Sequence, residues 1–328
     1  MKKIALLSFV LLFHWIINAQ NTSSKEAREI KKRTLIVGLE ELDAKMAKKL
    51  DGSLFEYTKT QIEGINYALK TAVEKYWNYN SKIIYMPLSE ATALVKKKPD
   101  DYAILQLYKY TDYWNLRVGN GWEKDVSNTR VNNSPAFYKY NPGTRYTEAA
   151  NEIVFLSIYM PSRICAINLP NLYVSLSDAV YGVMQMQYIL NRLNDEEKSS
   201  AFKVVQECNG KYLKEKTLLF CKDDLEKKLT ESKIREIYPF NFKIVTSDEI
   251  DSAILKKDDK SVIVQIVSSS GGKGNVSIHF LGDTQTGLIV GYVAPSVAFG
   301  AGRTSLIKYN EKINEKQLKD YLKIANCK

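Results

Sequence analysis

One stretch of this chain occurs twice, and this repetition constrains the fold more than any other feature of the sequence. The copy at Lys216–Val267 is matched by residues that begin at Arg33 and resume at Ser81. The matched residues are 183 positions apart at the start of the copy and 159 positions apart further on. The difference between the two offsets means that the first copy has gained 24 residues, which lie between Met46 and Ser81. This repetition predicts the architecture but says nothing yet about chemistry.

Each copy predicts the same series of elements. In the second copy we expect strands at 218–220, 242–245 and 261–267, helices at 231–238 and 248–255 capped by Thr230 and Ser247, a hairpin at 275–293, and a last helix at 315–325. In the first copy we expect strands at 34–37, 83–86, 103–108, 152–159 and 164–169. We expect helices at 60–77 and at 177–193, and a third helix that begins after an N-cap at Ser89. Leu39, Leu42 and Met46 predict a further short helix by their spacing. The order is therefore β-α-β-α-β-β-β-α in each unit, an α/β class with an α+β tendency in which helices cover two mixed sheets.

The length of 328 residues fits about two domains, and the first residues have the pattern of a secretory signal peptide. Lys2 and Lys3 precede an apolar run, Ile4–Ile17, and cleavage is expected at Ala19-Gln20. The run is shorter than the roughly 20 apolar residues that span a bilayer, so we expect a periplasmic or secreted protein without a transmembrane span. The predicted divisions are a signal peptide (1–19), a frayed polar leader (20–32), a first unit (33–194) with insertions near 47–80 and 109–150, a helical connector (195–215) and a second unit (216–328).

The basic charge is distributed in short lysine runs along the chain. The formal net charge is +10, and removal of the two lysines of the signal peptide leaves +8. Two of the runs, at 96–98 and 256–257, end predicted helices, where cations interact favourably with the helix dipole. We therefore expect a solvated surface and no nucleic-acid partner.

The four cysteines, Cys165, Cys208, Cys221 and Cys327, could form disulfides in an exported protein, and four cysteines allow three full pairings. Cys221 ends a predicted strand and Cys208 ends the connecting helix just upstream, so we favour the pair Cys208–Cys221. The chain has no CxxC pattern, and only one histidine remains after the signal peptide. The sequence therefore predicts neither a metal site nor a cofactor.

Several patterns that could carry chemistry have a structural interpretation. The loop 268–274 has glycine after its lysine and a strand behind it, which differs from a phosphate-binding loop. His279 lacks ligand-type neighbours, so we expect a structural or surface histidine, and Ser277, His279 and Asp283 are too close on one strand to form a catalytic triad. Acidic pairs such as the one at 40–41 recur in both copies, which favours helix starts and turns over acid catalysis.

The segment 109–150 is the most unusual part of the first unit, because the second unit has only a short Ser/Gly loop at that place. Tyrosine, tryptophan and arginine, which are enriched in it, are also enriched at binding hot spots. The segment can form a binding site for an envelope protein or a glycan, or it can only pack on the sheet. Its candidate binding residues are Tyr113, Trp114, Arg117, Trp122, Tyr138, Tyr140 and Arg145.

The order of elements, together with a D-x-x-T-G turn, resembles the α/β domain of the TolB N-terminal and curli-secretion-lipoprotein group of bacterial envelope proteins. The first unit departs from this pattern, since it has Met160-Pro161-Ser162-Arg163 at the place of the turn. The signal peptide ending in Ala-Gln is also similar to those of exported Bacteroidota proteins. The resemblance implies a non-enzymatic role in envelope assembly or interaction. The residues that carry it are Leu218–Phe220, Phe242–Val245, Ser261–Val267 and Asp283–Gly287.

We therefore expect an exported, non-catalytic envelope protein with a binding or assembly role that uses the aromatic insertion. Two alternatives stay open: a secreted hydrolase with a cleft between the two units, and a purely structural oligomer. The carboxylates of such a hydrolase would converge only in the folded protein.

Overall fold

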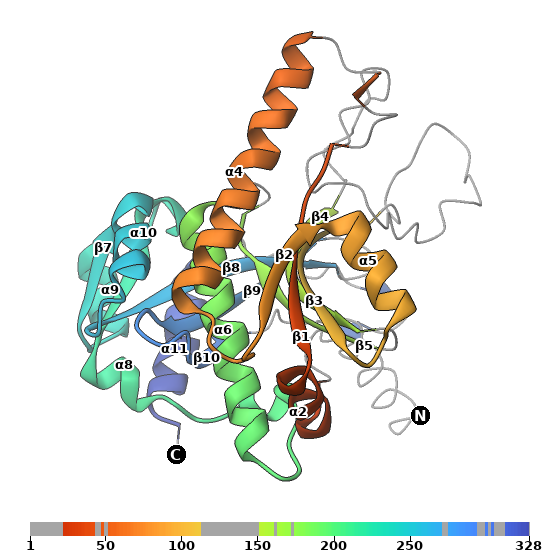
Figure 1. Cartoon of the computed structure of the whole chain (residues 1–328). Helices are drawn as coiled ribbons and strands as arrows, with labels where there is room; N and C mark the ends of the chain where they lie inside the picture. Colours follow the sequence, from red (N-terminus) through yellow and green to blue (C-terminus); the bar gives the residue numbers. More distant parts are fainter. Residues whose placement is uncertain are drawn as a thin grey trace.

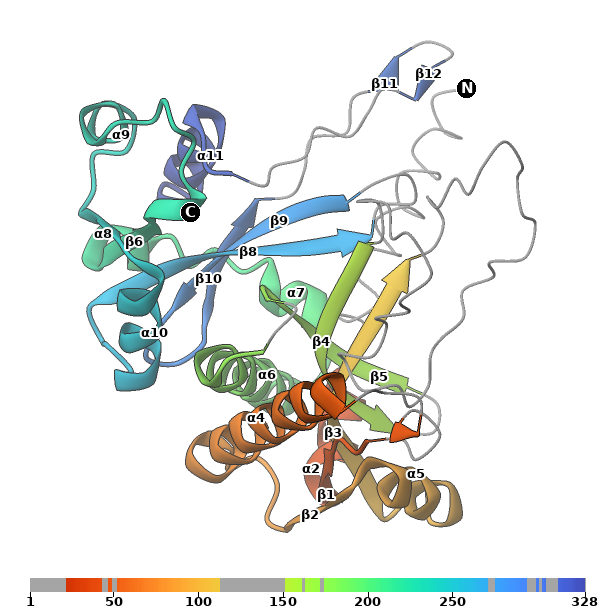
Figure 2. The same ribbon diagram turned by 90° about the horizontal axis from the view of Figure 1, so that it is seen from above.

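The computed structural model describes residues 22–42, 47–48, 52–112, 151–160, 163–171, 174–270, 275–293, 299–300, 303–304 and 312–327. These residues form a mixed α/β fold with two five-stranded mixed sheets, each covered by helices, as the sequence predicts (Figures 1 and 2). The two sheets lie side by side, with one helix between them.

Sheet 1 has the strand order β2-β1-β3-β4-β5. Its strands are β1 (Thr34–Leu39), β2 (Ile83–Pro87), β3 (Tyr102–Asp112), β4 (Asn151–Met160) and β5 (Arg163–Leu169). The first three are parallel, and β4 and β5 continue the sheet in antiparallel fashion. Side chains of α4 (Gly52–Tyr76) and α6 (Leu176–Asp195) pack on one face, and those of α5 (Leu88–Lys97) pack on the other.

Sheet 2 has the corresponding order, β7-β6-β8-β9-β10. Its strands are β6 (Thr217–Cys221), β7 (Phe242–Val245), β8 (Ser261–Ser270), β9 (Asn275–Asp283) and β10 (Ile289–Val293). The helices α9 (Glu231–Ile237) and α11 (Glu315–Ala325) cover one face, whereas α10 (Ser247–Lys256) and α6 cover the other. The remaining short elements are α7 (Ala201–Val205), α8 (Lys211–Glu215), η2 (Lys222–Asp224), β11 (Phe299–Gly300) and β12 (Arg303–Thr304).

The two sheets also agree in register. Leu35 pairs with Ile83 in sheet 1, and Leu218 pairs with Phe242 in sheet 2. These pairs are related by the offsets of 183 and 159 found in the sequence, and α5 and α10 both have ten residues. The residues gained by the first copy lie before β2, where α4 has 25 residues and its counterpart α9 has seven.

The helix α6 is buried between the two sheets. Gly182 faces sheet 1, where an added Cβ would approach the Leu169 side chain to 2.8 Å. Tyr181, next to it in sequence, faces sheet 2, where a Cβ at Gly282 would lie 1.7 Å from its hydroxyl oxygen. One continuous apolar core accordingly contains residues of both sheets, such as Leu105 and Ile263. The two units are therefore packed together through α6.

The D-x-x-T-G turn between β9 and β10 is a structural device. The buried Asp283 carboxylate forms an ion pair with Lys216 and accepts hydrogen bonds from the backbone N–H (2.9 Å) and the hydroxyl (2.6 Å) of Thr286. Gly287 has a φ of 74°, and a Cβ there would lie 2.6 Å from the backbone of α6 at Met184 and Gln185. Only glycine combines this conformation with this close approach.

Some local predictions were wrong. The leader expected to be frayed forms α2 (Ser24–Lys32), which begins with a capping box between Ser23 and Glu26 and packs on α6. Ala27 and Ile30 are fully buried. The segment is therefore an amphipathic helix whose apolar side packs in the core, although its polar composition did not indicate a helix.

The predicted helix caps were correct in one of three cases. Thr230 caps α9 as expected. Ser89 lies inside α5, which begins after Pro87, and Thr246 caps α10 in place of Ser247. Leu39 belongs to β1, and residues 40–42 are not helical. Residues 43–46 of that predicted short helix lie outside the described residues.

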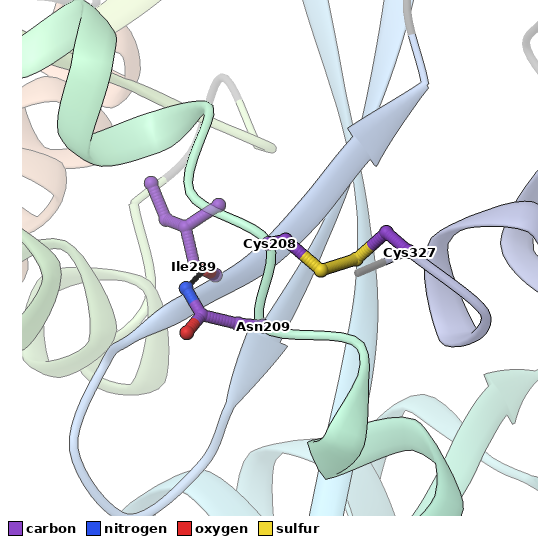
Figure 3. The surroundings of a disulfide bond; sticks show 4 residues. All are labelled: Cys208, Asn209, Ile289 and Cys327. Atoms are coloured by element: carbon purple, nitrogen blue, oxygen red, sulfur yellow. Dashed lines mark hydrogen bonds between the residues drawn. A yellow bond between two sulfur atoms is a disulfide. The ribbon is translucent and has the colours of Figure 1, made fainter.

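The predicted pairing of Cys208 with Cys221 was also wrong. Cys208 forms a disulfide with Cys327, which lies just after α11 (Figure 3). The connector reaches α11 because Asn209 donates a hydrogen bond to the Ile289 carbonyl (3.1 Å) and Gly210 is in close contact with the last turn of α11. Cys221 and Cys165 are buried free thiols. Nearness in sequence was misleading, because the packing of α11 brings the end of the chain to Cys208.

The disulfide encloses the whole of sheet 2, since its cysteines are 119 residues apart. We expect Cys327→Ser to lower the free energy of unfolding by about 4 kcal/mol, because a loop of this length is strongly restricted in the unfolded chain. Urea unfolding measures this loss. Cys221→Ala is the control and should cost less than about 1 kcal/mol. An equal loss in both variants would contradict the observed pairing.

Gly282 lets Tyr181 pack against sheet 2, and the contact can be tested with a double-mutant cycle. Gly282→Ala should cost about 3 kcal/mol, because the added methyl group overlaps the Tyr181 hydroxyl. Tyr181→Phe removes that oxygen, which has no hydrogen bond of normal geometry in the described structure. The double variant should therefore recover a large part of the loss. Additive losses in urea unfolding would show that the two residues do not meet.

Candidate functional site

The carboxyl ends of the parallel strands of sheet 1 form its most plausible binding edge on topological grounds. The chain leaves β1 toward α4 on one face and leaves β2 toward α5 on the other. The strand order also reverses at β1, since β2 lies on one side of it and β3 on the other, and open α/β sheets bind ligands at such a switch point. In Figure 1 this edge is the upper end of sheet 1, where α5 begins and beyond which the first half of α4 projects.

Glu40 lies at this switch point, directly after β1. Its backbone N–H donates to Asn66 Oδ1 (2.8 Å), and its carbonyl accepts from Asn66 Nδ2 (2.9 Å), so α4 holds the backbone in place. The residue is only 8 % exposed. Among the described residues, no group donates a hydrogen bond to its carboxylate.

Burial raises the pKa of Glu40 to about 7, and the neighbouring charge of Glu41 adds to the effect. A carboxyl group that titrates near neutral pH can exchange a proton with a ligand, which is why such groups cluster at functional sites. An uncompensated buried carboxylate also costs stability, so its presence calls for a physical reason.

Glu41 completes the edge at the start of α5. Ser89 donates a hydrogen bond to the Glu41 carboxylate (2.6 Å). The helix has no side-chain cap of its own, because Pro87 occupies the N-cap position. A negative charge beside the first turn interacts favourably with the helix dipole, so Glu41 has a structural role here. The acidic pair therefore divides into one carboxylate beside the start of α5 and one buried carboxyl group.

The same edge of sheet 2 is closed. Residues 312–314 run along it, with Ile313 in a parallel bridge to Leu225 and its backbone N–H donating to the Asp224 carbonyl (2.7 Å). Burial raises the pKa of Asp224, but the charge of Lys312 opposes this change. The edge of sheet 2 thus has a covering segment and a compensating cation, and Glu40 has no cation of this kind in the described residues.

The aromatic insertion leaves sheet 1 at this edge. β3 and β4 stay paired up to Asp112 and Asn151, so the insertion comprises residues 113–150. In sheet 2, β8 and β9 stay paired up to Ser270 and Asn275, and only residues 271–274 connect them. The predicted binding residues of the insertion, Tyr113, Trp114, Arg117, Trp122, Tyr138, Tyr140 and Arg145, lie outside the described residues.

His279 is a structural residue, as the sequence predicts. It is fully buried, and its Nδ1 lies 2.5 Å from the hydroxyl of Tyr321 on α11. Asp283 is engaged by Lys216 and Thr286. In the part of the chain that the structure describes, no three His, Cys, Asp or Glu side chains are grouped closely enough to hold a metal ion.

The space between the two units contains two carboxylates, but both serve helix ends. Ser177 donates to Asp251 across the interface (2.6 Å). Asp178 accepts hydrogen bonds from Ser175 and Asn171 at the start of α6, and burial raises its pKa. The apolar surface of α6 fills the described part of the interface, where no observation favours a hydrolase.

Comparison of the chain with protein-family models, with curated proteins and with solved structures gave no match. The similarity to the TolB N-terminal group stays a prediction. No helix in the described segments combines the length and hydropathy that crossing a bilayer requires.

The carboxyl group of Glu40 should make stability depend on pH. Its pKa in the folded state is about 7, against an ordinary value of 4.5, so the folded protein binds this proton more tightly than the unfolded chain does. The resulting stability is complete below about pH 4.5 and is lost as the pH rises through 7. Glu40→Gln should therefore match the wild type at pH 4 and exceed it at pH 8 by roughly 3 kcal/mol.

Urea unfolding at pH 4, 6 and 8 measures this difference. Glu56→Gln, on the exposed side of α4, is the control and should show no such trend. A difference between Glu40→Gln and wild type that is constant with pH would contradict the uncompensated burial of this group.

Proposed function

We propose that this protein is an exported, non-catalytic envelope protein that binds a protein or glycan partner through the aromatic insertion at residues 113–150. The observation that carries this proposal is the comparison of the two hairpins. β3 and β4 pair without a break up to the insertion, and the equivalent hairpin in sheet 2 is connected by four residues, 271–274. The fold therefore does not require the additional residues.

The composition and position of the insertion support a binding role. Its tyrosine, tryptophan and arginine residues offer large, rigid contact surfaces with polar groups, which suit both protein surfaces and sugar rings. It also leaves the sheet at the switch-point edge, next to the strands that position Glu40. The predicted signal peptide at 1–19 supports a partner in the cell envelope or outside the cell.

The structure allows a test in which only the insertion is changed. Replacing residues 113–150 with Gly-Gly-Lys-Gly, the connection used by sheet 2, should leave the circular dichroism and the urea midpoint nearly unchanged, because the paired strands end at Asp112 and Asn151. The shortened protein should lose the partners that the full chain recovers from envelope fractions or from a glycan array.

Single substitutions refine this test. Trp114→Ala or Trp122→Ala should weaken binding at least tenfold if these residues are hot spots. Leu255→Ala, at an exposed apolar position on α10, is the control and should bind as the wild type does. Unchanged binding by a correctly folded shortened protein would exclude the insertion as the binding segment.

A further inference from the structure

The exposed side of α4 carries an uncharged seam that the monomer does not use. Its inner side, which includes Ile65, Leu69 and Val73, packs in the core of sheet 1. Its outer side includes Tyr57 and Tyr67, which are 53 % and 65 % exposed. Exposed tyrosine rings offer a partner large, rigid contact area together with a polar hydroxyl group.

The residues of this outer side have the spacing of a coiled-coil seam. Tyr57, Thr60, Gly64, Tyr67 and Thr71 follow one another at intervals of three and four residues, which are the first and fourth positions of successive heptads. None of them is charged. A Cβ at Gly64 would meet nothing within 4 Å, so the backbone is open to close approach at the middle of the seam.

The helix also projects far enough to reach another molecule. It is 25 residues long, whereas α9 covers the equivalent position of sheet 2 with seven. In Figure 1 the first half of α4 extends beyond the carboxyl edge of sheet 1, away from the body of the protein.

We propose that this seam binds a second copy of the chain, with the two α4 helices packed antiparallel about a two-fold axis. In that arrangement Tyr57 lies against Tyr67 of the second copy, and Thr60 lies against Gly64 of the second copy. Both tyrosines then become buried in aromatic pairs, and the small residues let the helices approach at the centre.

The charges beside the seam select the antiparallel direction. Antiparallel pairing places Glu56 beside Lys70 of the second copy, and this attractive pair occurs twice in the dimer. The one pair of like charges that it creates is between Glu63 and Glu63 of the second copy. Parallel pairing would instead place Lys70 beside Lys75 of the second copy, with like charges. Lys70 is half-exposed next to Glu74 and is accessible for such a contact.

Sedimentation equilibrium of the purified protein over a concentration series tests the proposal. The wild type should form a dimer, and Tyr57→Ser with Tyr67→Ser should raise the dimer dissociation constant at least tenfold while leaving the circular dichroism unchanged. Lys59→Ser, exposed on the same helix but outside the seam, should dimerise normally. The protein with the shortened 113–150 segment should also dimerise, which separates this proposal from the function proposed above.

Two further measurements test the geometry. Glu56→Lys should weaken the dimer, and the addition of Lys70→Glu should restore it. Mild oxidation should form a disulfide between Thr60→Cys protein and Gly64→Cys protein in a mixture, but should not link either variant to itself. Antiparallel pairing offsets identical positions along the helices, and a disulfide cannot bridge Cα atoms more than about 7 Å apart.

Three outcomes would overturn the proposal. The first is a monomer at every concentration, even if another protein binds to α4. The second is a dimer that the tyrosine substitutions leave unchanged. The third is self-linkage of the Thr60→Cys variant, which would indicate parallel pairing.

Discussion

The rest of the structure depends on the burial of α6 between the two sheets. A mixed sheet with apolar residues on both faces needs cover on both. Sheet 2 has α10 over part of one face, and α6 from the first unit covers the remainder. Tyr181 and Gly182 are adjacent in sequence but contact different sheets. Because α6 supplies part of both cores, the two units form one folded body although they have the same topology.

This burial explains why the two copies differ at the turn between their last two strands. In sheet 2 the turn Asp283–Gly287 lies directly on the backbone of α6, and Gly287 must be glycine. Sheet 1 contacts α6 with the face that α11 covers in sheet 2, and its sequence at the place of the turn is the different one of residues 160–163. The motif that produced the resemblance to an envelope family is thus also a local packing requirement, and its presence does not by itself indicate a shared function.

The sequence predicted those features that depend on local periodicity and failed on those that depend on distant parts of the chain. The offsets of 183 and 159 give the strand register, because each strand and helix keeps its own pattern of apolar residues. The Cys208–Cys327 disulfide depends on where α11 packs, and the burial of α2 depends on α6. Glu40 was assigned to a helix start, because Leu39, Leu42 and Met46 have helical spacing. The position of Glu40 at the carboxyl end of a central parallel strand was the signal that could have identified it.

Three features that distinguish unit 1 from unit 2 concern one edge of sheet 1. Among the described residues no group donates a hydrogen bond to the buried carboxylate of Glu40 there, α4 extends beyond it, and β3 and β4 lead into the aromatic insertion. At the equivalent edge of sheet 2, residues 312–314 pair with the backbone around Leu225 and supply Lys312 as a cation near Asp224. A closed edge with compensated charge suits a scaffold, and an edge with a desolvated acid and additional chain suits recognition. The comparison of two similar units within one chain therefore supports the proposal that this edge of sheet 1 carries the function, since the second unit shows what the fold needs and the first shows what has been added.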